Sequence, residues 1–186
     1  MDTLLPSHET ALLVVDVQPR LLGMVPPERS EHLTTRISVL IQTARQLAVP
    51  ILALEQDPER HGETVPAILA DLQKAGARRS VKRSFSAVRE EDFLHTLNAL
   101  GRRRVIVCGL QAHLGVFFTA RDLVLEGFIT QAPRDGVLSL HAEDEAAGLD
   151  LMRQSGVIIT TVETAVLDWV GRSTHPAFSD VLRRLP

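Results

Sequence analysis

The sequence predicts an α/β fold of the three-layer Rossmann-like type, in which a six-stranded, mostly parallel sheet carries helices on both faces. Short apolar runs alternate along the chain with longer segments whose apolar residues recur at helical spacing. Several of the short runs are apolar at every position, as expected for strands that are covered on both faces. No repeat or linker interrupts this alternation, so residues 1–186 are expected to form one domain.

The first elements can be bounded from their apolar patterns. Residues 11–15 form an apolar run that ends at Asp16, which is typical of a central strand. In residues 28–47 the apolar positions fall on one helical face, and this helix leads into a second buried strand at residues 51–54. The polar stretch 55–64 is expected to be a loop over the strand tips.

The alternation continues to the end of the chain. The remaining strands are expected at residues 79–83, in a segment that begins at Val105, at residues 128–132 and at residues 157–161. The remaining helices are expected at residues 65–74, 86–100, 113–126, 142–154, 163–170 and 176–185. The third strand is too basic for the centre of a sheet, so we expect it on the outside.

Composition narrows the partners that the protein can have. The formal net charge of -3 over 186 residues gives no general attraction for nucleic acid or for anionic lipid. No stretch is apolar enough to span a bilayer, residues 1–7 lack the pattern of an export signal, and a lone cysteine cannot form an internal disulfide. We therefore expect a cytoplasmic protein that binds neither nucleic acid nor a membrane.

Three segments are expected to meet at one edge of the sheet. Asp16 follows the first strand, Lys82 lies near the end of the third, and residues 111–115 connect the fourth strand to its helix. In an open parallel sheet the carboxyl ends of the strands border the crevice in which ligands bind. The sequence therefore predicts a pocket around residues 111–115, with Asp16 and Lys82 beside it.

Asp16 and Lys82 each allow two interpretations. A carboxylate in an apolar crevice has a raised pKa and can act as a general acid, although an Asp after a strand also often caps its own loop. An ammonium group near Asp16 would keep that carboxylate ionised and could neutralise an anionic substrate. Lys82 also lies in a basic stretch, however, and such stretches are usually solvated surface.

Other chemistry is disfavoured. Cys108 falls inside an apolar strand, where a thiol is usually an inert small hydrophobic side chain. His113, at the start of a helix, could donate to a substrate or simply cap the helix. The histidines show no metal-ligand spacing, and the chain has no glycine-rich dinucleotide or phosphate loop. We therefore expect no metal and no other cofactor.

Three motifs, in order, resemble one known family. LLVVDVQ contains Asp16, KRSFSAV contains Lys82, and VIVCGLQAHLGVFFTARDLVLEG follows as the fourth strand and its helix. Together they are similar to the isochorismatase-like hydrolases, also called the cysteine hydrolase superfamily, which include nicotinamidases and carbamoylsarcosine hydrolases. The tail LMRQSGVIITTVETAVLDWVG, followed by HPAF, looks most like the isochorismatase-domain proteins of eukaryotes and their bacterial relatives.

The resemblance implies a catalytic triad with one member missing. In the family an Asp, a Lys and a Cys form the site, and these carry over to Asp16, Lys82 and position 115. Position 115 is Gly here. Without a thiolate at that position the covalent thioester route to amide hydrolysis is unavailable, and Cys108 lies on the strand and cannot replace it.

Two functions remain open under this resemblance. True isochorismatases carry a similar G-x-x-A-H-x-G pattern, matched here by residues 109–115, and in them the Asp protonates a vinyl ether before water is added. Asp16 could act in that way, with Lys82 and backbone amides near Gly115 holding an anion. Alternatively, the chain is a catalytically silent protein that keeps the pocket and binds a small molecule or acts as a scaffold.

The resemblance also implies further site residues and partners. Pocket-lining residues carry over to Gln18, Gln56, Phe85, Leu110, Gln111, Ala112, His113 and Leu114. A cis peptide bond that does not involve proline is expected between Leu110 and Gln111 or next to it. The substrate is expected to be a small molecule, and the positive charge of Lys82 favours an anionic one. The chain is expected to form a homo-oligomer. The metal-binding set of nicotinamidases is absent from residues 55–64, which argues against nicotinamide.

Overall fold

The computed structural model describes residues 6–185, so the expectation about an export signal lies largely outside the described residues. Its strands are β1 (Thr10–Val15), β2 (Ile51–Gln56), β3 (Arg78–Lys82), β4 (Arg104–Leu110), β5 (Ile129–Pro133), β6 (Val137–Leu138) and β7 (Ile158–Thr160). Its α-helices are α1 (Pro19–Leu22), α2 (Pro27–Gln46), α3 (Pro58–His61), α4 (Pro66–Lys74), α5 (Phe93–Ala99), α6 (Phe117–Leu125), α7 (Ala142–Gln154), α8 (Val162–Val170) and α9 (Phe178–Arg184).

The strands form one parallel sheet in the order β3-β2-β1-β4-β5-β7, which confirms the α/β class and the outer place of β3. The two-residue strand β6 joins the end of β4 and adds a short seventh strand that the sequence did not reveal. From β1 the chain proceeds through β2 to β3 on one side, and it then returns to the other side of β1 to form β4, β5 and β7. The direction in which strands are added therefore reverses between β1 and β4. The carboxyl ends of these two strands therefore border the crevice that such a switch creates.

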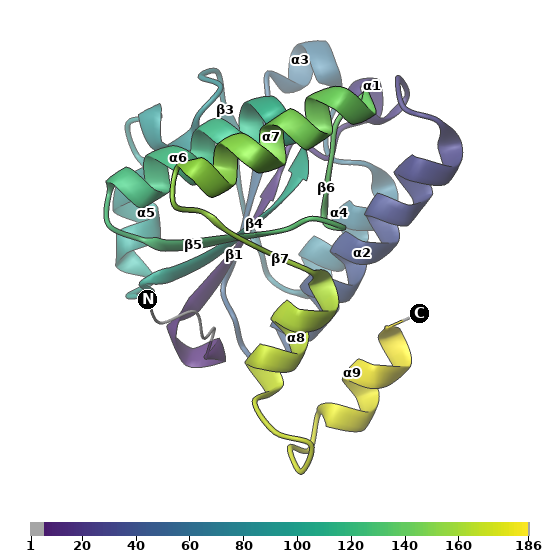
Figure 1. The fold of residues 1–186 in the computed structure, drawn as a ribbon, viewed down its shortest axis with the longest axis vertical. Coiled ribbons are helices and arrows are strands. Elements are labelled where there is room, and N and C mark those ends of the chain that lie inside the picture. The colour runs from purple at the N-terminus through teal and green to yellow at the C-terminus, as the bar shows by residue number, and fades with distance from the viewer. Residues whose placement is uncertain (1–5, 186) are drawn as a thin grey trace.

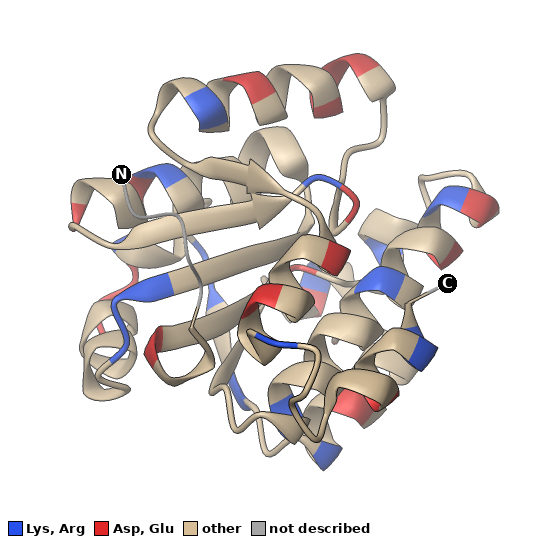
Figure 2. Cartoon of the chain, turned by 60° about the horizontal axis from the view of Figure 1, so that its bottom comes forward, with Lys and Arg blue, Asp and Glu red and all other residues tan. Residues whose placement is uncertain are grey.

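Helices cover both faces of the sheet, as Figure 1 shows. One face packs against α2, α4, α8 and α9, and the other packs against α5, α6 and α7. All six residues of β1 and all seven of β4 are buried, because apolar side chains on both sides of each strand enter one of the two cores. Charged residues lie mostly on helices and loops, and the central strands carry few (Figure 2).

One glycine allows β1 and β4 to pair up to their ends. Gly109 lies opposite Val15 in the register and has a φ of 122°. A Cβ atom at Gly109 would lie 1.9 Å from the carbonyl oxygen of Val15, well inside van der Waals contact. A side chain is therefore excluded at the point where the chain leaves β4 for the candidate site.

The predicted helix over residues 86–100 was wrong in its first half. The structure has a short 3₁₀ turn at Ala87–Arg89, and α5 begins only at Phe93. Between them Glu90 is extended, and its carboxylate accepts hydrogen bonds from the backbone amides of Arg83 and Ser84. These hydrogen bonds hold the backbone away from a helical path.

Two other segments also differ from the predicted pattern. The expected loop 55–64 contains the last residues of β2 and the one-turn helix α3. The predicted helix 113–126 begins as a π-helical turn, Ala112–Val116, before α6 continues it. Single π turns of this kind are often found at functional sites.

Candidate active site

The first site residue, Asp16, lies directly after β1, where the backbone turns. Its φ of 55° is in the left-handed region, and its amide donates to the carbonyl of Leu54 on the neighbouring strand. Asp tolerates this conformation better than most side chains do. The turn holds the carboxylate at the crevice edge of the sheet, where Oδ2 lies 2.7 Å from Nζ of Lys82.

Lys82 reaches this carboxylate from the far side of β2. It ends the edge strand β3, and its Nζ donates to the side-chain oxygen of Gln56 at 2.6 Å and lies 3.5 Å from the carbonyl oxygen of Phe85. The side chain of Lys82 is 1% exposed and that of Asp16 is 5% exposed. Lys82 is therefore a buried partner of Asp16, and the surface interpretation of this lysine is excluded.

The carboxyl group of Asp16 holds its proton more tightly than an ordinary Asp. Burial raises its pKa from 3.8 to about 6, because desolvation disfavours the charged form, and the Lys82 charge opposes but does not cancel this rise. Its Oδ1 atom is buried and has no hydrogen-bond partner among the described residues. Such an orphaned oxygen costs about 1–3 kcal/mol, so it calls for an explanation beyond stability.

The third position, Gly115, lies against this pair. The expected cis peptide bond is present between Leu110 and Gln111, and the π-helical turn that follows it brings Gly115 next to Asp16. A Cβ atom on Gly115 would lie 2.8 Å from Oδ2 of Asp16 and 3.3 Å from the carbonyl oxygen of Leu110. The absence of a side chain therefore lets the turn approach the carboxylate closely.

The turn is also closely packed on its outer side by α7. A Cβ atom on Gly148 of α7 would lie 2.7 Å from three backbone atoms of Ala112 and His113. The amides of Leu114 and Val116 both donate to the carbonyl of Gln111. These two amides cannot donate to a substrate anion while the turn keeps this form.

The two glutamines predicted to line the pocket are held by the protein itself. The side-chain amide of Gln18 donates to the carbonyls of Gln56 and Gly62, and its oxygen accepts from the amide of Gln56. The side chain of Gln56 accepts from Lys82 and donates to the carbonyl of Arg83. Both thus support the Lys82 ammonium group, and their contact with a substrate stays a prediction.

His113 has a partner that the sequence did not reveal. Its Nδ1 lies 2.8 Å from the hydroxyl oxygen of Ser139, which is fully buried after β6. The amide of Ser139 donates to Glu145, and Glu145 pairs with Arg29 of α2. No local sequence signal marks Ser139, because its approach to His113 depends on the pairing of β6 with β4.

The remaining predicted site residues differ in their access to solvent. Leu110 and Ala112 are buried, Gln111 and Leu114 are partly buried, and Phe85 is 63% exposed. Their roles toward a substrate stay predictions.

Cys108 is a core residue, as its place in the strand predicted. Its Sγ lies in contact with the carbonyl of Leu13, and complete burial raises the pKa of the thiol. Within residues 6–185, no group of three or more His, Cys, Asp or Glu side chains could hold a metal ion. None of the described helices combines the length and the apolar character needed to cross a membrane.

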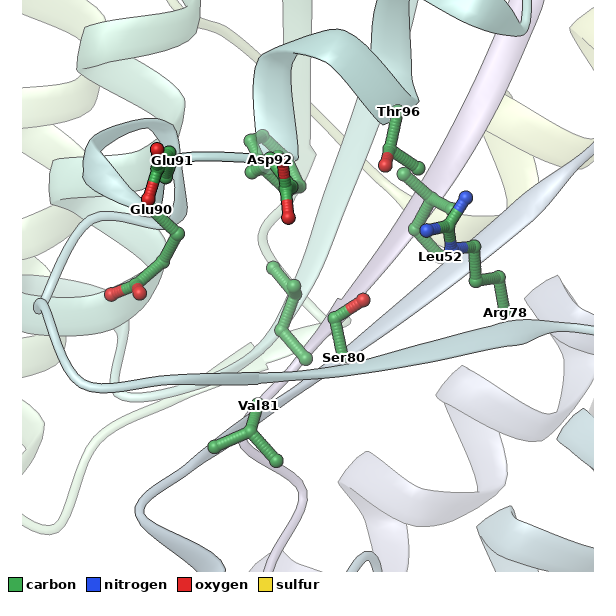
Figure 3. Close-up of a pocket in the computed structure, with 10 residues that line it drawn as sticks. Leu52, Arg78, Ser80, Val81, Glu90, Glu91, Asp92 and Thr96 are labelled. Atoms are coloured by element: carbon green, nitrogen blue, oxygen red, sulfur yellow. The ribbon is translucent and has the colours of Figure 1, made fainter.

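A separate cavity of about 270 Å³ lies between β3 and the start of α5 (Figure 3). Glu90, Glu91 and Asp92 line it on one side and Arg78 and Ser80 on the other. Neither Asp16, Lys82 nor Gly115 belongs to its lining. This cavity is therefore distinct from the place where the three motifs meet.

The sequence and the fold are similar to those of known proteins. The isochorismatase domain model matches residues 10–164. Isochorismatase domain-containing protein 2 from Danio rerio is 30% identical over 182 residues, which cover 97% of this chain and 89% of that protein. The structure of MAR1 ribonuclease from Caenorhabditis elegans has a TM-score of 0.88 and 29% identity over 97% of this chain and 91% of that one.

A fold likeness extends to more distant proteins. The YcaC gene product of Escherichia coli, described as an octameric hydrolase of unknown specificity, has a TM-score of 0.90. It is 19% identical and covers 99% of this chain and 91% of that one, so the fold alone is shared. From the domain match and the identity with its relatives, the chain belongs to the isochorismatase family.

Proposed function

We propose that this chain is a hydrolase of a small molecule that works without a thiol nucleophile. In this proposal Asp16 is the general acid and Lys82 is its electrostatic partner. The observation that carries it is the buried contact between the two side chains at the end of β1, with an Asp16 pKa of about 6 and an unpartnered Oδ1. A carboxyl group with that pKa keeps part of its protonated form near neutral pH.

The chemistry that fits these groups is hydrolysis of a vinyl ether. Protonated Asp16 transfers its proton to the terminal alkene carbon, and the ether oxygen stabilises the oxocarbenium ion that forms. Water adds to that cation and returns a proton to Asp16, after which the hemiketal C–O bond breaks to release a ketone and an alcohol. No protein nucleophile takes part, so Gly115 is compatible with every step.

The test measures pyruvate released from isochorismate, the vinyl ether that defines this chemistry. Asp16→Asn removes the transferable proton and is expected to lower kcat/KM by about a hundredfold or more. Asp150→Asn on the surface of α7 is the matched control and should leave kcat/KM unchanged. Unchanged turnover in Asp16→Asn would remove Asp16 from the mechanism.

A catalytically silent small-molecule-binding or scaffold protein is the second candidate. It is favoured by the near-complete burial of Asp16 and Lys82 and by the absence of the family thiol at position 115. The discriminating variant is Gly115→Cys, assayed on a panel of amides and vinyl ethers. Thiol-dependent amidase activity in this variant, with none in the wild type on either substrate class, would favour the silent protein.

The proposal also covers the oligomeric state and the cellular location of the protein, and its assay includes a contrasting substrate. The octameric description of the E. coli neighbour supports a homo-oligomer here, which sedimentation analysis of the purified chain tests. The single buried thiol of Cys108 is compatible with a cytoplasmic location. The C. elegans neighbour is described as a ribonuclease, so RNA is included in the assay as a contrasting substrate.

A further inference from the structure

The cavity beside β3 has opposite charges on its two sides. β3 is the last strand on its side of the sheet, and the cavity of about 270 Å³ lies between this strand and the start of α5. The acidic side is formed by Glu90, Glu91 and Asp92, in the segment before α5 (Figure 3). The basic side is Arg78, the first residue of β3. The cavity is slightly smaller than the range of about 300–1,000 Å³ that is typical for drug-sized ligands, so it suits a smaller molecule.

Two of the three acidic side chains are free to meet a ligand. The Glu90 carboxylate already accepts hydrogen bonds from the amides of Arg83 and Ser84. Glu91 and Asp92 are exposed, and within residues 6–185 neither side chain forms an ion pair or a hydrogen bond. The protein therefore leaves these two negative charges unbalanced, and a cation in the cavity would balance them.

Arg78 is the corresponding cation on the other side. It is exposed, and its guanidinium group forms no ion pair with any residue that the structure describes, Asp92 included. The sheet register places Arg78 opposite Leu52 of β2, whose side chain also lines the cavity. Arg78 and Asp92 thus line the same cavity without touching each other.

A buried hydroxyl group on α5 indicates a polar ligand. Thr96 lines the cavity and is only 8% exposed, and Figure 3 shows its hydroxyl oxygen directed into the cavity. In the described part of the chain this hydroxyl group has no hydrogen-bond partner. Buried hydroxyl groups are normally hydrogen-bonded. A charged group of a ligand in the cavity would give this one a partner.

The rest of the cavity wall is largely apolar. Leu52 and Leu54 of β2 and Phe93 of α5 contribute to it, and all three are buried. Such a surface favours methylene groups, because they lose contact with water when they bind there. A fitting ligand therefore carries its charges at its ends and an aliphatic chain between them.

We propose that this cavity binds a small ω-amino acid, with its ammonium group at the acidic side, its carboxylate at Arg78 and its methylene chain over Leu52 and Leu54. A ligand with a single charge would leave one side of the cavity unbalanced. Guanidinium groups bind carboxylates through paired hydrogen bonds, and carboxylates bind ammonium groups through charge-assisted ones. The inference goes beyond the proposed function, because no residue of the catalytic pair lines this cavity.

The test measures the binding of four five-carbon probes to the whole chain by calorimetry. δ-Aminovalerate carries a charge at each end, norvaline carries both charges at one end, and valerate and pentylamine carry one charge each. δ-Aminovalerate is expected to bind about tenfold more tightly than each of the others. Equal affinity for pentylamine or valerate would show that only one side of the cavity binds, and equal affinity for norvaline would exclude separated charges. Each of these results would overturn the proposal.

Two variants test the two ends of the ligand separately. Arg78→Gln is expected to weaken δ-aminovalerate about tenfold and to leave pentylamine unchanged. Asp92→Asn is expected to weaken δ-aminovalerate about tenfold and to leave valerate unchanged. The matched controls are Arg172→Gln, in the loop between α8 and α9, and Asp150→Asn on α7, both exposed and outside the cavity. A variant that binds δ-aminovalerate as tightly as its control would exclude that end of the assignment, and the proposal would fail.

The hydroxyl group of Thr96 has its own test. Thr96→Val keeps the shape of the side chain and removes the oxygen, so it is expected to weaken δ-aminovalerate about fivefold. The free energy of unfolding should not fall, because the hydroxyl group has no partner in the described part of the chain. Unchanged affinity together with lower stability would show that the hydroxyl group serves the fold, and it would contradict the proposed ligand position.

A second copy of the chain is the competing occupant, because an edge strand can pair with another strand. Sedimentation of the wild type, Arg78→Gln and Asp92→Asn tests this. If either variant lowers the oligomeric mass and the wild type binds no δ-aminovalerate, the cavity belongs to an interface between copies and the proposal fails. Equal masses, with binding lost only in the variants, would support the ω-amino acid.

Discussion

Oδ2 of Asp16 lies 2.7 Å from Nζ of Lys82, and almost no part of either side chain reaches solvent. A buried ion pair of this kind adds little to stability, because the free energy of desolvating both charges offsets their attraction. An apolar pair would fill the same space with less desolvation. The proposed general acid chemistry gives the pair a role that its small contribution to stability does not.

The pH dependence of turnover should report the Asp16 carboxyl group. Its pKa is about 6, and a general acid must be protonated, so kcat/KM on a vinyl ether should be constant well below pH 6 and fall above it. Lys82 opposes the rise of this pKa, so Lys82→Met should shift the fall to higher pH. A pH profile of both proteins measures this, and a fall at the same pH in both would contradict it.

The pH dependence of stability should have the corresponding sign. Because the pKa of Asp16 is raised from 3.8 to about 6, the folded protein keeps a proton that the unfolded chain releases between these values. This contribution is fully present below pH 3.8 and is lost as pH rises through about 6. Urea unfolding across this range should show the loss in the wild type, and Asp16→Asn should lack it.

The buried pair should behave as a unit in a double-mutant cycle. Asp16→Asn leaves Lys82 without its counter-charge, and Lys82→Met leaves Asp16 without its own, so each should lower the free energy of unfolding by about 3–5 kcal/mol at pH 7. The double variant leaves neither charge and should cost less than the sum of the two. Additive losses in denaturant unfolding would show that the two groups are not coupled.

Gly115 should tolerate no side chain without cost. The Cβ atom of Gly115→Ala would lie 2.8 Å from Oδ2 of Asp16, so the carboxylate or the turn must move, at about 1–3 kcal/mol of stability. The same shift should lower turnover, because the ion pair changes. Asn98→Ala on α5 is a suitable control. Gly76→Ala is not, because the φ of Gly76 is 65° and any side chain is strained there. A Gly115→Ala protein with full stability and turnover would contradict this prediction.

The meeting of Asp16 with Lys82 could be predicted from the sequence, and the structure confirms it. Parallel strands end at one edge of a sheet, so residues placed after β1 and at the end of β3 must point to the same crevice. The sequence could not predict that Lys82 is buried, because its neighbours in the chain are basic and exposed. That outcome depends on Gln56, which receives the ammonium group above the end of β2.

The parts that were missed depend on individual polar contacts that an apolar pattern does not reveal. The helix expected at residues 86–100 is interrupted because the Glu90 carboxylate accepts hydrogen bonds from the amides of Arg83 and Ser84. Helical periodicity does not reveal a side chain that bonds to the backbone in this way. The Ser139 partner of His113 requires the pairing of β6 with β4. Apolar patterns determined the layers, whereas individual polar bonds determined the details of the site.

The contact between Gly148 of α7 and the backbone of Ala112 and His113 has a consequence for ligand recognition. A turn wedged between β4 and a thirteen-residue helix cannot adjust alone, since any displacement must carry α7 with it. Its dipoles therefore keep one orientation before and after an encounter with a ligand. A rigid wall of this kind selects by rejecting molecules of the wrong shape.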